Sequence, residues 1–337
     1  MKAYEYRRFG LDNLALVERD EPRAAAHEVA VKFHAVSLNY RDLLFARGIY
    51  NPNAQFPAVP FCDGAGEVVE VGEHVTRWKL GDRVSPIYFQ GWLEGEHSAQ
   101  KDRTIIGAGY FDLDGVGSEY GVFDENGLVK IPEHLSFEEA ATLPCAAVTA
   151  WHALIHFGSL KAGDTVLTLG TGGVSIFALQ FAKMHGAQVI ATSSSDEKVG
   201  RVRELGADET INYKRVPDWD KEVVRLTNGI GVDHVVEVGG VGTLSKSVNS
   251  ARIGGRVALI GVLASGSGFD PINVLLKTIR MQGILVGSRQ MFENMNRAIE
   301  ANRLKPVIDR TFAFKEARKA LDYLESGSHF GKIVLKF

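Results

Sequence analysis

One stretch constrains the fold more than any other. The apolar run Val166–Leu169 leads into the glycine turn GTGGVS and then into a helical pattern, Ile176–His185. A strand, a glycine turn and a helix in this order bind the pyrophosphate of a dinucleotide on the N–H groups of the helix start. Ser175 replaces the third glycine, and serine is small enough for close helix–strand packing. An isolated match is more often only a helix start, so the prediction depends on its surroundings. The predicted cofactor contacts of the turn are Gly170, Thr171, Gly172, Gly173 and Val174.

The surroundings repeat the same unit. Short apolar runs alternate with segments of helical periodicity, such as Glu197–Leu205 and Lys221–Thr227. Strands joined by helical crossovers form a parallel sheet with helices on both faces. The sequence therefore predicts an α/β, doubly wound parallel sheet of the Rossmann kind. Its expected strands are Val166–Leu169, Gln188–Thr192, Glu209–Asn212, His234–Val238, Arg256–Ile260 and Gly283–Val286.

The tip of the second expected strand indicates which dinucleotide binds. A carboxylate at this place bonds the ribose 2′-hydroxyl of NAD and repels a 2′-phosphate. The chain instead has Ser193, Ser194 and Ser195, with Lys198 in the following turn. Hydroxyls and an ammonium suit a phosphate monoester, which favours NADPH over NADH. Alternatively these serines cap the next helix and Lys198 is solvated, and both interpretations can hold together.

The first part of the chain has a different character. Segments such as EVAVKFHAVSL, AGEVVEVG and GDRVSPIY are rich in β-formers and are separated by Gly, Pro and Asp. After one helical segment, the tail ends on the β-like GKIVLKF, which we expect to rejoin the first domain. The predicted organisation is a β-rich domain formed by residues 1–125 and 290–337, with a Rossmann domain of residues 126–289 between them.

Composition excludes several classes of function. The net charge of −3 gives no basic surface for nucleic acid, and no apolar run approaches the ~20 residues of a membrane span. The N-terminus lacks the apolar core of a signal peptide, and two cysteines are too few for a secreted disulfide framework. We therefore expect a cytoplasmic protein that acts on a small molecule and has neither a nucleic-acid nor a membrane partner.

Motifs along almost the whole chain resemble the medium-chain dehydrogenase/reductase superfamily, within its zinc-free, quinone-oxidoreductase-like branch. The residues that carry the resemblance are SLNYRDLLFARGIY (37–50), DGAGEVVEVGEHVTRWKLGDRV (63–84), LPCAAVTAWHAL (143–154), the glycine turn, GADETINY (206–213), GGRVALIG (254–261) and GKIVL (331–335). The resemblance implies a GroES-like catalytic domain with an inserted Rossmann domain. It also implies that further residues contact NADPH, namely Thr149, Tyr213, Gly239, Gly261, Val262, Val286, Gly287 and Lys332. For Tyr213 and Lys332 the alternatives are a strand-end aromatic and a solvated lysine.

The resemblance also bears on zinc. In zinc-dependent members, cysteine, histidine and cysteine ligands occupy the positions of Asn39, Cys62 and Cys145. Asparagine is a poor zinc ligand, and a catalytic zinc usually needs three protein ligands. Residues 85–144 contain no cysteine, so the family's structural zinc lobe has no counterpart. We expect no metal. Cys62 and Cys145 remain open to three interpretations: buried packing, a weak metal site with Asp63, or a redox pair.

The expected function is an NADPH-dependent oxidoreductase that reduces a quinone or an activated double bond without zinc. The candidate catalytic residues are Asn39, Tyr40 and Tyr50, and Asp42 is expected to be structural. The alternatives are that Tyr40 and Tyr50 only pack with satisfied hydroxyls and that Asn39 holds the nicotinamide. A metal-assisted alcohol dehydrogenase and a non-catalytic NADPH-binding protein are the alternatives. The resemblance further implies a homodimer, in which the apolar strand GRVALIGVL (255–263) would supply an exposed edge.

Overall fold

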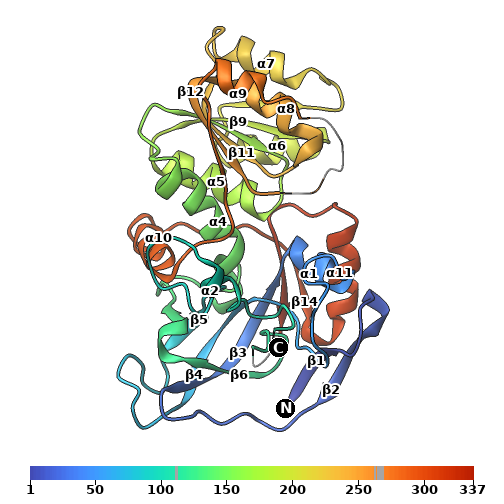
Figure 1. Ribbon diagram of the computed structural model, residues 1–337, viewed down its shortest axis with the longest axis vertical. Coiled ribbons are helices and arrows are strands. Elements are labelled where there is room, and N and C mark those ends of the chain that lie inside the picture. The colour runs from blue at the N-terminus through green and yellow to red at the C-terminus, as the bar shows by residue number, and fades with distance from the viewer. Residues whose placement is uncertain (111–112, 262, 264–268) are drawn as a thin grey trace. The chain divides into compact units, whose positions relative to one another are not determined.

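The computed structural model describes residues 1–110, 113–261, 263 and 269–337. These residues form two compact units, Met1–Val148 with Gly287–Phe337 and Thr149–Val286. Both chain termini belong to the first unit (Figure 1).

The first unit is built on a largely antiparallel sheet with the strand order β14-β15-β3-β4-β5-β7, in which β6 also pairs with β3. Its longest strand shows why this segment is extended. Val31 and Phe33 are buried on either side of the exposed Lys32, and the last four residues of the strand are buried on both faces, so β3 runs through the core of the unit. The strands of this sheet are β3 (Glu28–Leu38), β4 (Asp63–Val71), β5 (Arg83–Pro86), β6 (Tyr120–Asp124), β7 (Leu128–Lys130), β14 (Ile308–Ala313) and β15 (Lys332–Lys336). A separate antiparallel pair consists of β1 (Lys2–Tyr6) and β2 (Leu14–Glu18).

Helices and short turns surround this sheet. They are η1 (Leu11–Asn13), α1 (Tyr40–Ala46), α2 (Ala99–Asp102), η2 (Glu125–Gly127), α3 (Phe137–Ala140), η3 (Leu143–Ala147), α10 (Arg289–Asn302), η5 (Phe314–Glu316) and α11 (Ala317–Glu325). The C-terminal strand β15 pairs antiparallel with β3, which places Ile333 opposite Leu38. The expectation that the tail rejoins the first domain is therefore confirmed.

The second unit is a parallel sheet with the order β10-β9-β8-β11-β12-β13. Helices α5 and α6 pack on β8, β9 and β10, and α8 packs on β11 and β12. The central strands β8, β9 and β11 are almost continuously buried, as expected of a parallel sheet that helices cover, and the core includes Leu167, Ile190, Val235 and Val257. This order, with the third strand at one edge and the sixth at the other, is that of the Rossmann fold. The predicted fold class is confirmed.

The elements of the second unit lie close to their expected positions. Its strands are β8 (Thr165–Leu169), β9 (Gln188–Ser193), β10 (Glu209–Asn212), β11 (Val232–Glu237), β12 (Ala251–Leu259) and β13 (Arg280–Gly283). Its helices are η4 (His152–Phe157), α5 (Gly173–Met184), α6 (Asp196–Glu204), α7 (Trp219–Leu226), α8 (Val241–Ser250) and α9 (Ile272–Leu276), and α4 (Val148–Trp151) begins at the boundary.

Two sequence expectations about the last strands need correction. The sixth strand ends at Gly283 and does not run over Gly283–Val286, where Val286 has a positive φ of 52° that breaks an extended strand. β12 is not an edge strand, because β13 pairs with it in parallel register from Arg256 to Leu259. The exposed edge of the sheet therefore belongs to β13.

The boundaries of the units also differ from the expected ones. The first unit continues past residue 125 to Val148, because β7 pairs with β5 and so extends the first sheet. At the other boundary the units divide after Val286, a few residues before the expected position. Among the described residues, no helix is both long and apolar enough to cross a membrane.

Candidate functional site

The glycine turn leaves room for a ligand at the start of α5. Gly170 follows β8 directly and has a φ of 71°, a backbone conformation that favours glycine. A Cβ added to Gly170 or Gly172 would meet no atom within 4 Å, and no side chain caps the helix at Gly172. Ser175 is buried and donates to the carbonyl of Leu169 at 2.6 Å, which ties the turn to the strand. The open space beside an uncapped helix N-terminus fits the pyrophosphate of a dinucleotide.

The tips of β9 and β10 bring the predicted 2′-phosphate residues together. Ser193 ends β9, Ser195 caps α6 by accepting the N–H of Lys198 at 3.2 Å, and Tyr213 donates its N–H to the Ser193 carbonyl at 3.0 Å. Ser193 is buried, Ser194 and Lys198 are half-buried, and Tyr213 is exposed. The helix-capping interpretation of Ser195 is thus correct, and contact of these residues with a phosphate stays a prediction.

The sequence interpretation did not identify Arg215, a cation near the tips of β9 and β10. Arg215 forms an ion pair with Asp196 in the first turn of α6, and Asn212 donates to the other oxygen of the same carboxylate at 2.7 Å. Asp196 would otherwise repel a phosphate at the strand tip. No short motif marks Arg215. The parallel pairing of β9 with β10 brings it to the tip.

A buried carboxylate shapes the next tip. Glu237, at the end of β11, accepts hydrogen bonds from the N–H groups of Gly239 and Gly240 and from the hydroxyls of Thr243 and Ser247. It is fully buried and therefore holds the loop rather than a ligand. A buried glutamate without a neighbouring motif gave no signal in the sequence.

The remaining predicted cofactor residues have clear local roles. A Cβ on Gly261 would come within 1.7 Å of the Val238 carbonyl, so this glycine is required by close backbone packing. The Val286 carbonyl lies 2.8 Å from Nδ1 of His152, and Thr149 and Gly287 are buried. Val262 lies outside the described residues. Contact of these residues with a cofactor stays a prediction.

In the first unit, a polar cluster forms where three neighbouring strands begin or end. Lys332 starts β15, Asn39 follows β3, and Asp63 starts β4. The pairing of β3 with both other strands sets them side by side, with Ser37 opposite Asp63. The Lys332 ammonium is buried and donates to the Leu38 carbonyl at 2.8 Å, to Oδ1 of Asn39 at 2.6 Å and to Oδ2 of Asp63 at 3.3 Å.

This arrangement changes the interpretation of Lys332. The solvated-lysine alternative is wrong, because the side chain is 3% exposed. An ammonium has three N–H donors, and three acceptors of the first unit surround it. The geometry favours an internal role over the predicted NADPH contact. It also fixes the amide of Asn39: with the oxygen turned to Lys332, Nδ2 points the other way and donates to the sulfur of Cys62 at 3.6 Å.

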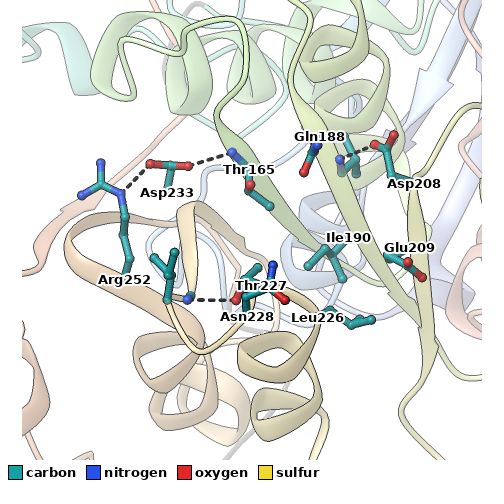
Figure 2. Close-up of a pocket in the computed structure, with 13 residues that line it drawn as sticks. Thr165, Gln188, Ile190, Asp208, Glu209, Leu226, Thr227, Asn228, Asp233 and Arg252 are labelled. Atoms are coloured by element: carbon teal, nitrogen blue, oxygen red, sulfur yellow. Dashed lines mark hydrogen bonds and ion pairs between the residues drawn. The ribbon is translucent and has the colours of Figure 1, made fainter.

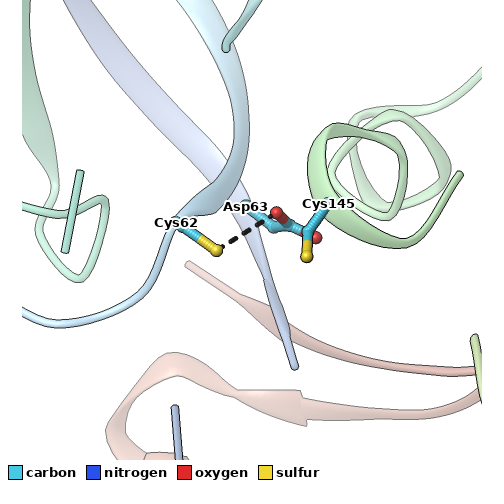
Figure 3. A group of neighbouring side chains, drawn as sticks. All are labelled: Cys62, Asp63 and Cys145. Carbon is cyan, nitrogen blue, oxygen red and sulfur yellow. Dashed lines mark hydrogen bonds between the residues drawn. The ribbon is translucent and has the colours of Figure 1, made fainter. Parts of the chain in front are cut away.

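The two cysteines meet beside this cluster. The sulfurs of Cys62 and Cys145 and a carboxylate oxygen of Asp63 all lie within 4.8 Å of one another. Figure 3 shows the three side chains facing one another from the start of β4 and from η3. Cys62 is buried and donates to Oδ1 of Asp63 at 3.4 Å. Burial raises the pKa of the Cys62 thiol well above its usual value, and burial likewise raises the pKa of Asp63.

These residues fit a catalytic zinc poorly. Asp63 would be the third ligand, yet one of its oxygens accepts the Cys62 thiol and the other lies against the Lys332 ammonium. Lys332 also holds the oxygen of Asn39. A dication bound to Asp63 would therefore lie next to a buried positive charge, and Cys62 is held as a thiol although zinc requires a thiolate.

Two tyrosines adjoin the cysteines. The hydroxyls of Tyr50 and Tyr88 form a short hydrogen bond, and the Arg41 guanidinium lies 4.6 Å from the centre of the Tyr50 ring and 5.6 Å from that of Tyr88. Carbonyls of residues 106 and 107 fix the guanidinium. Burial raises the pKa of Tyr50, so it stays a protonated donor at neutral pH. Tyr88 carried no signal in the sequence.

The other two candidates near α1 have different surroundings. Tyr40 is 36% exposed and lies near Arg47, and Arg47 pairs with Glu325 on α11. Among the described residues, no hydrogen bond joins Tyr40 to the cysteine cluster. Asp42 accepts the backbone N–H of Asn39 at 2.8 Å, which supports the structural role expected for it.

A separate pocket of about 310 Å³ lies at the amino ends of the parallel strands. Figure 2 shows Thr165, Gln188 and Glu209, which each begin a strand, among its lining residues. Two of its charged residues pair with each other, since Asp233 forms an ion pair with Arg252 and also accepts the Thr165 N–H. The glycine turn and the strand tips lie at the opposite, carboxyl edge, so this pocket is not part of the predicted cofactor site.

Comparisons with known proteins agree with this architecture. Residues 25–133 match the alcohol dehydrogenase GroES-like domain, and residues 173–301 match the zinc-binding dehydrogenase family. A solved structure named NAD-dependent alcohol dehydrogenase is 33% identical with a TM-score of 0.91, and the match covers 100% of both chains.

Three curated relatives differ in their named activities. A zinc-type alcohol dehydrogenase-like protein of Schizosaccharomyces pombe is 44% identical over 97% of this chain and 96% of its own. The acryloyl-coenzyme A reductase of Metallosphaera sedula is 30% identical over 94% and 95%. The quinone oxidoreductase of Sus scrofa is 28% identical over 99% and 97%. The resemblance to the quinone-oxidoreductase-like branch is therefore not specifically supported, because the zinc-type relative is more similar.

Proposed function

Because the chain belongs to the medium-chain dehydrogenase/reductase superfamily of NAD(P)-dependent oxidoreductases, we propose that it reduces activated double bonds or quinones with NADPH and without zinc. The observation that carries this proposal is the Lys332–Asn39 contact at 2.6 Å, which turns the Asn39 amide into an oriented hydrogen-bond donor.

Asn39 is suited to hold a substrate oxygen. An amide nitrogen has two N–H groups, and the contact with Cys62 uses one of them. Lys332 draws electron density from the amide oxygen, which strengthens the N–H as a donor. A preorganised donor of this kind stabilises the negative charge that develops on an enolate or quinol oxygen.

Tyr50 is the proposed proton donor. Tyr88 shares a hydrogen bond with it, and the nearby Arg41 charge stabilises the phenolate that remains after proton transfer. A bound nicotinamide would supply the hydride. Asn39 and Tyr50 of the first unit would then bind the substrate oxygen and donate a proton.

The substrate class follows from this donor set. Hydrogen bonds from an amide and a phenol activate an oxygen less strongly than a Lewis acid does, so they suit substrates that are already electrophilic. Enones, unsaturated thioesters and quinones meet this condition. The named activities of the Metallosphaera and Sus relatives support unsaturated thioesters and quinones, respectively.

NADPH is the proposed cofactor because of the β9 and β10 tips. Ser193, Ser194 and Lys198 offer hydroxyls and an ammonium, and Arg215 neutralises the carboxylate of Asp196. A similar solved structure is named NAD-dependent, so the affinities for NADPH and NADH need to be compared directly.

The test combines elemental analysis with turnover. We expect no stoichiometric zinc in the purified protein and no effect of chelators. NADPH oxidation should proceed with members of an enone and quinone panel. One zinc per chain together with alcohol oxidation would instead support the alternative of a metal-assisted alcohol dehydrogenase, for which the Cys62–Asp63–Cys145 group and the zinc-type relative are the supporting observations. Tight NADPH binding without any turnover would support the non-catalytic alternative.

A further inference from the structure

The two cysteines of the chain have no role in the proposed reaction, yet they lie together. The sequence of 337 residues contains only two cysteines, Cys62 and Cys145. They come from distant parts of the chain, and their sulfurs lie within 4.8 Å of each other. Both are reduced. Any reagent that reacts with one thiol therefore has the second within reach.

The two thiols differ in a way that assigns an order of reaction. Cys145, on η3, is partly exposed, whereas Cys62 is completely buried. The Cys62 sulfur accepts an N–H of Asn39 and donates its own hydrogen to Oδ1 of Asp63 at 3.4 Å. An oxidant from solvent thus meets Cys145 first, and Cys62 has a proton acceptor already in place.

We propose that Cys62 and Cys145 form a dithiol modification site, which hydroperoxides convert into a disulfide. In the first step the O–O bond of the peroxide breaks, an S–O bond forms on Cys145, and an alcohol or water leaves with the Cys145 thiol proton. In the second step the Cys62 sulfur attacks the Cys145 sulfur, the Cys62 proton passes by way of Asp63 to the departing oxygen, and the S–O bond breaks to release water. Two thiols lose two electrons in total, and these reduce the peroxide.

The geometry requires only a modest movement. A disulfide needs the sulfurs to approach to about 2.05 Å with their Cα atoms about 4.4–6.8 Å apart. The pair joins the residue before β4 to the short segment η3, and β4 and η3 pack against each other. Closure removes the Cys62 hydrogen bond to Asp63 and moves the sulfur that Asn39 contacts. The site thus lies directly beside the proposed oxygen-binding amide, but its oxidation uses neither the hydride nor the substrate of the proposed reductase reaction.

The main experiment needs no substrate. The purified full-length protein is treated with limiting hydrogen peroxide, and thiols are counted under denaturing conditions. We expect two thiols to fall to none and the intact mass to fall by two hydrogen atoms. Peptide mapping should find Cys62 joined to Cys145 within one chain, and dithiothreitol should restore both thiols.

Single variants test the assigned order. In Cys62→Ala, peroxide should leave a sulfenic acid on Cys145 that dimedone traps. In Cys145→Ala, Cys62 should stay reduced at the same peroxide dose. Alanine is small and apolar at both positions, and a thermal melt identifies a variant that does not fold.

A second probe measures proximity without oxidation. Phenylarsine oxide bridges two adjacent thiols, so it should bind one per wild-type chain and resist a monothiol competitor. Each single variant should bind it about 100-fold or more weakly, because the second contact is lost.

Four results would overturn the proposal. They are oxidation of wild-type Cys145 to sulfinic acid without a disulfide, linkage between chains only, equal arsenical binding by wild type and single variants, and one tightly held metal ion per chain on the two thiols. These readouts do not depend on turnover. A failure here is thus distinguishable from a failure of the proposed reductase function.

Discussion

The ammonium of Lys332 lies 2.6 Å from the side-chain oxygen of Asn39, and the two residues stand at opposite ends of the first unit's chain. This contact selects one of the two orientations of the amide, since an ammonium donates and only the oxygen accepts. The contact with Lys332 therefore leaves Nδ2 of Asn39 to act as a hydrogen-bond donor toward any ligand.

Replacing Lys332 tests this positioning role. Lys332→Met should lower kcat by about 10- to 150-fold, because the loss of an oriented charged hydrogen bond costs about 1.5–3 kcal/mol. NADPH affinity, measured by fluorescence titration, should stay unchanged. Lys332→Arg, which keeps the charge and donors, should recover part of the rate. A loss of NADPH affinity in Lys332→Met would instead support the direct contact between Lys332 and NADPH that the resemblance implied.

Replacing Tyr50 tests the proton donor. Tyr50→Phe should lower turnover on an enone by about 10²-fold, near the lower end of general acid catalysis. The effect on a 1,4-quinone should be smaller, because water can protonate a quinol. Tyr88→Phe is the matched variant, since it keeps Tyr50 but removes its hydrogen-bond partner. Tyr88→Phe should lower the rate of enone reduction less than Tyr50→Phe does, and it should shift the pH profile of this reaction. Equal losses on both substrates would contradict a proton-donor role.

The cofactor prediction concerns Lys198. Lys198→Ala should weaken NADPH binding by about 10- to 150-fold, equivalent to roughly 1.5–3 kcal/mol, and leave NADH almost unchanged. Arg215→Ala should act in the same direction, because it exposes the carboxylate of Asp196 to the phosphate. Calorimetric titration with both cofactors measures the difference. An equal loss of affinity for NADPH and NADH would mean that Lys198 and Arg215 do not contribute to recognition of the 2′-phosphate.

The expected homodimer is tested through the surface of the second unit. β13 is an edge strand, and Leu275 and Leu276 of α9 are 72% and 68% exposed. An exposed edge and neighbouring apolar side chains are features of interaction surfaces. We expect a dimer in light scattering at micromolar concentration and its weakening by Leu276→Glu. Ile230→Glu is the control, because Ile230 is equally exposed but lines the pocket at the amino ends of the strands. A monomeric wild type would refute the prediction.

Asp42 makes stability depend on pH in an unusual direction. Burial raises its pKa to about 6, although Arg41 opposes the shift. A carboxyl with a raised folded-state pKa binds more protons in the folded state, so its contribution to stability increases as pH falls through about 6. Between about pH 7.5 and about pH 5 the wild type should gain about 1 kcal/mol of unfolding free energy relative to Asp42→Asn. Urea denaturation of both proteins at the two pH values measures this difference, and a pH-independent difference would argue against the raised pKa.

The sequence predicted the second unit well because its signals are local. The run Val166–Leu169, the glycine turn and the helical periodicity after it are each readable within about a dozen residues, and β8 and α5 occur there. The sequence placed the sixth strand wrongly, because no clear periodicity marks that segment. Gly283–Val286 is apolar, but the edge strand is the polar Arg280–Gly283, and only its pairing with β12 identifies it.

The polar cluster shows what the sequence alone could not supply. Sequence motifs singled out Asn39, Tyr50, Cys62 and Cys145, but they gave Lys332 a different partner and did not single out Tyr88. Lys332 meets Asn39 because β15 pairs with β3, and Asp63 joins them because β4 pairs with the other side of β3. Residue types and local periodicity thus determined the fold class and the candidate chemistry. The partners of each buried polar group were decided by strand pairing between distant segments, because a buried donor or acceptor must find its partner in three dimensions.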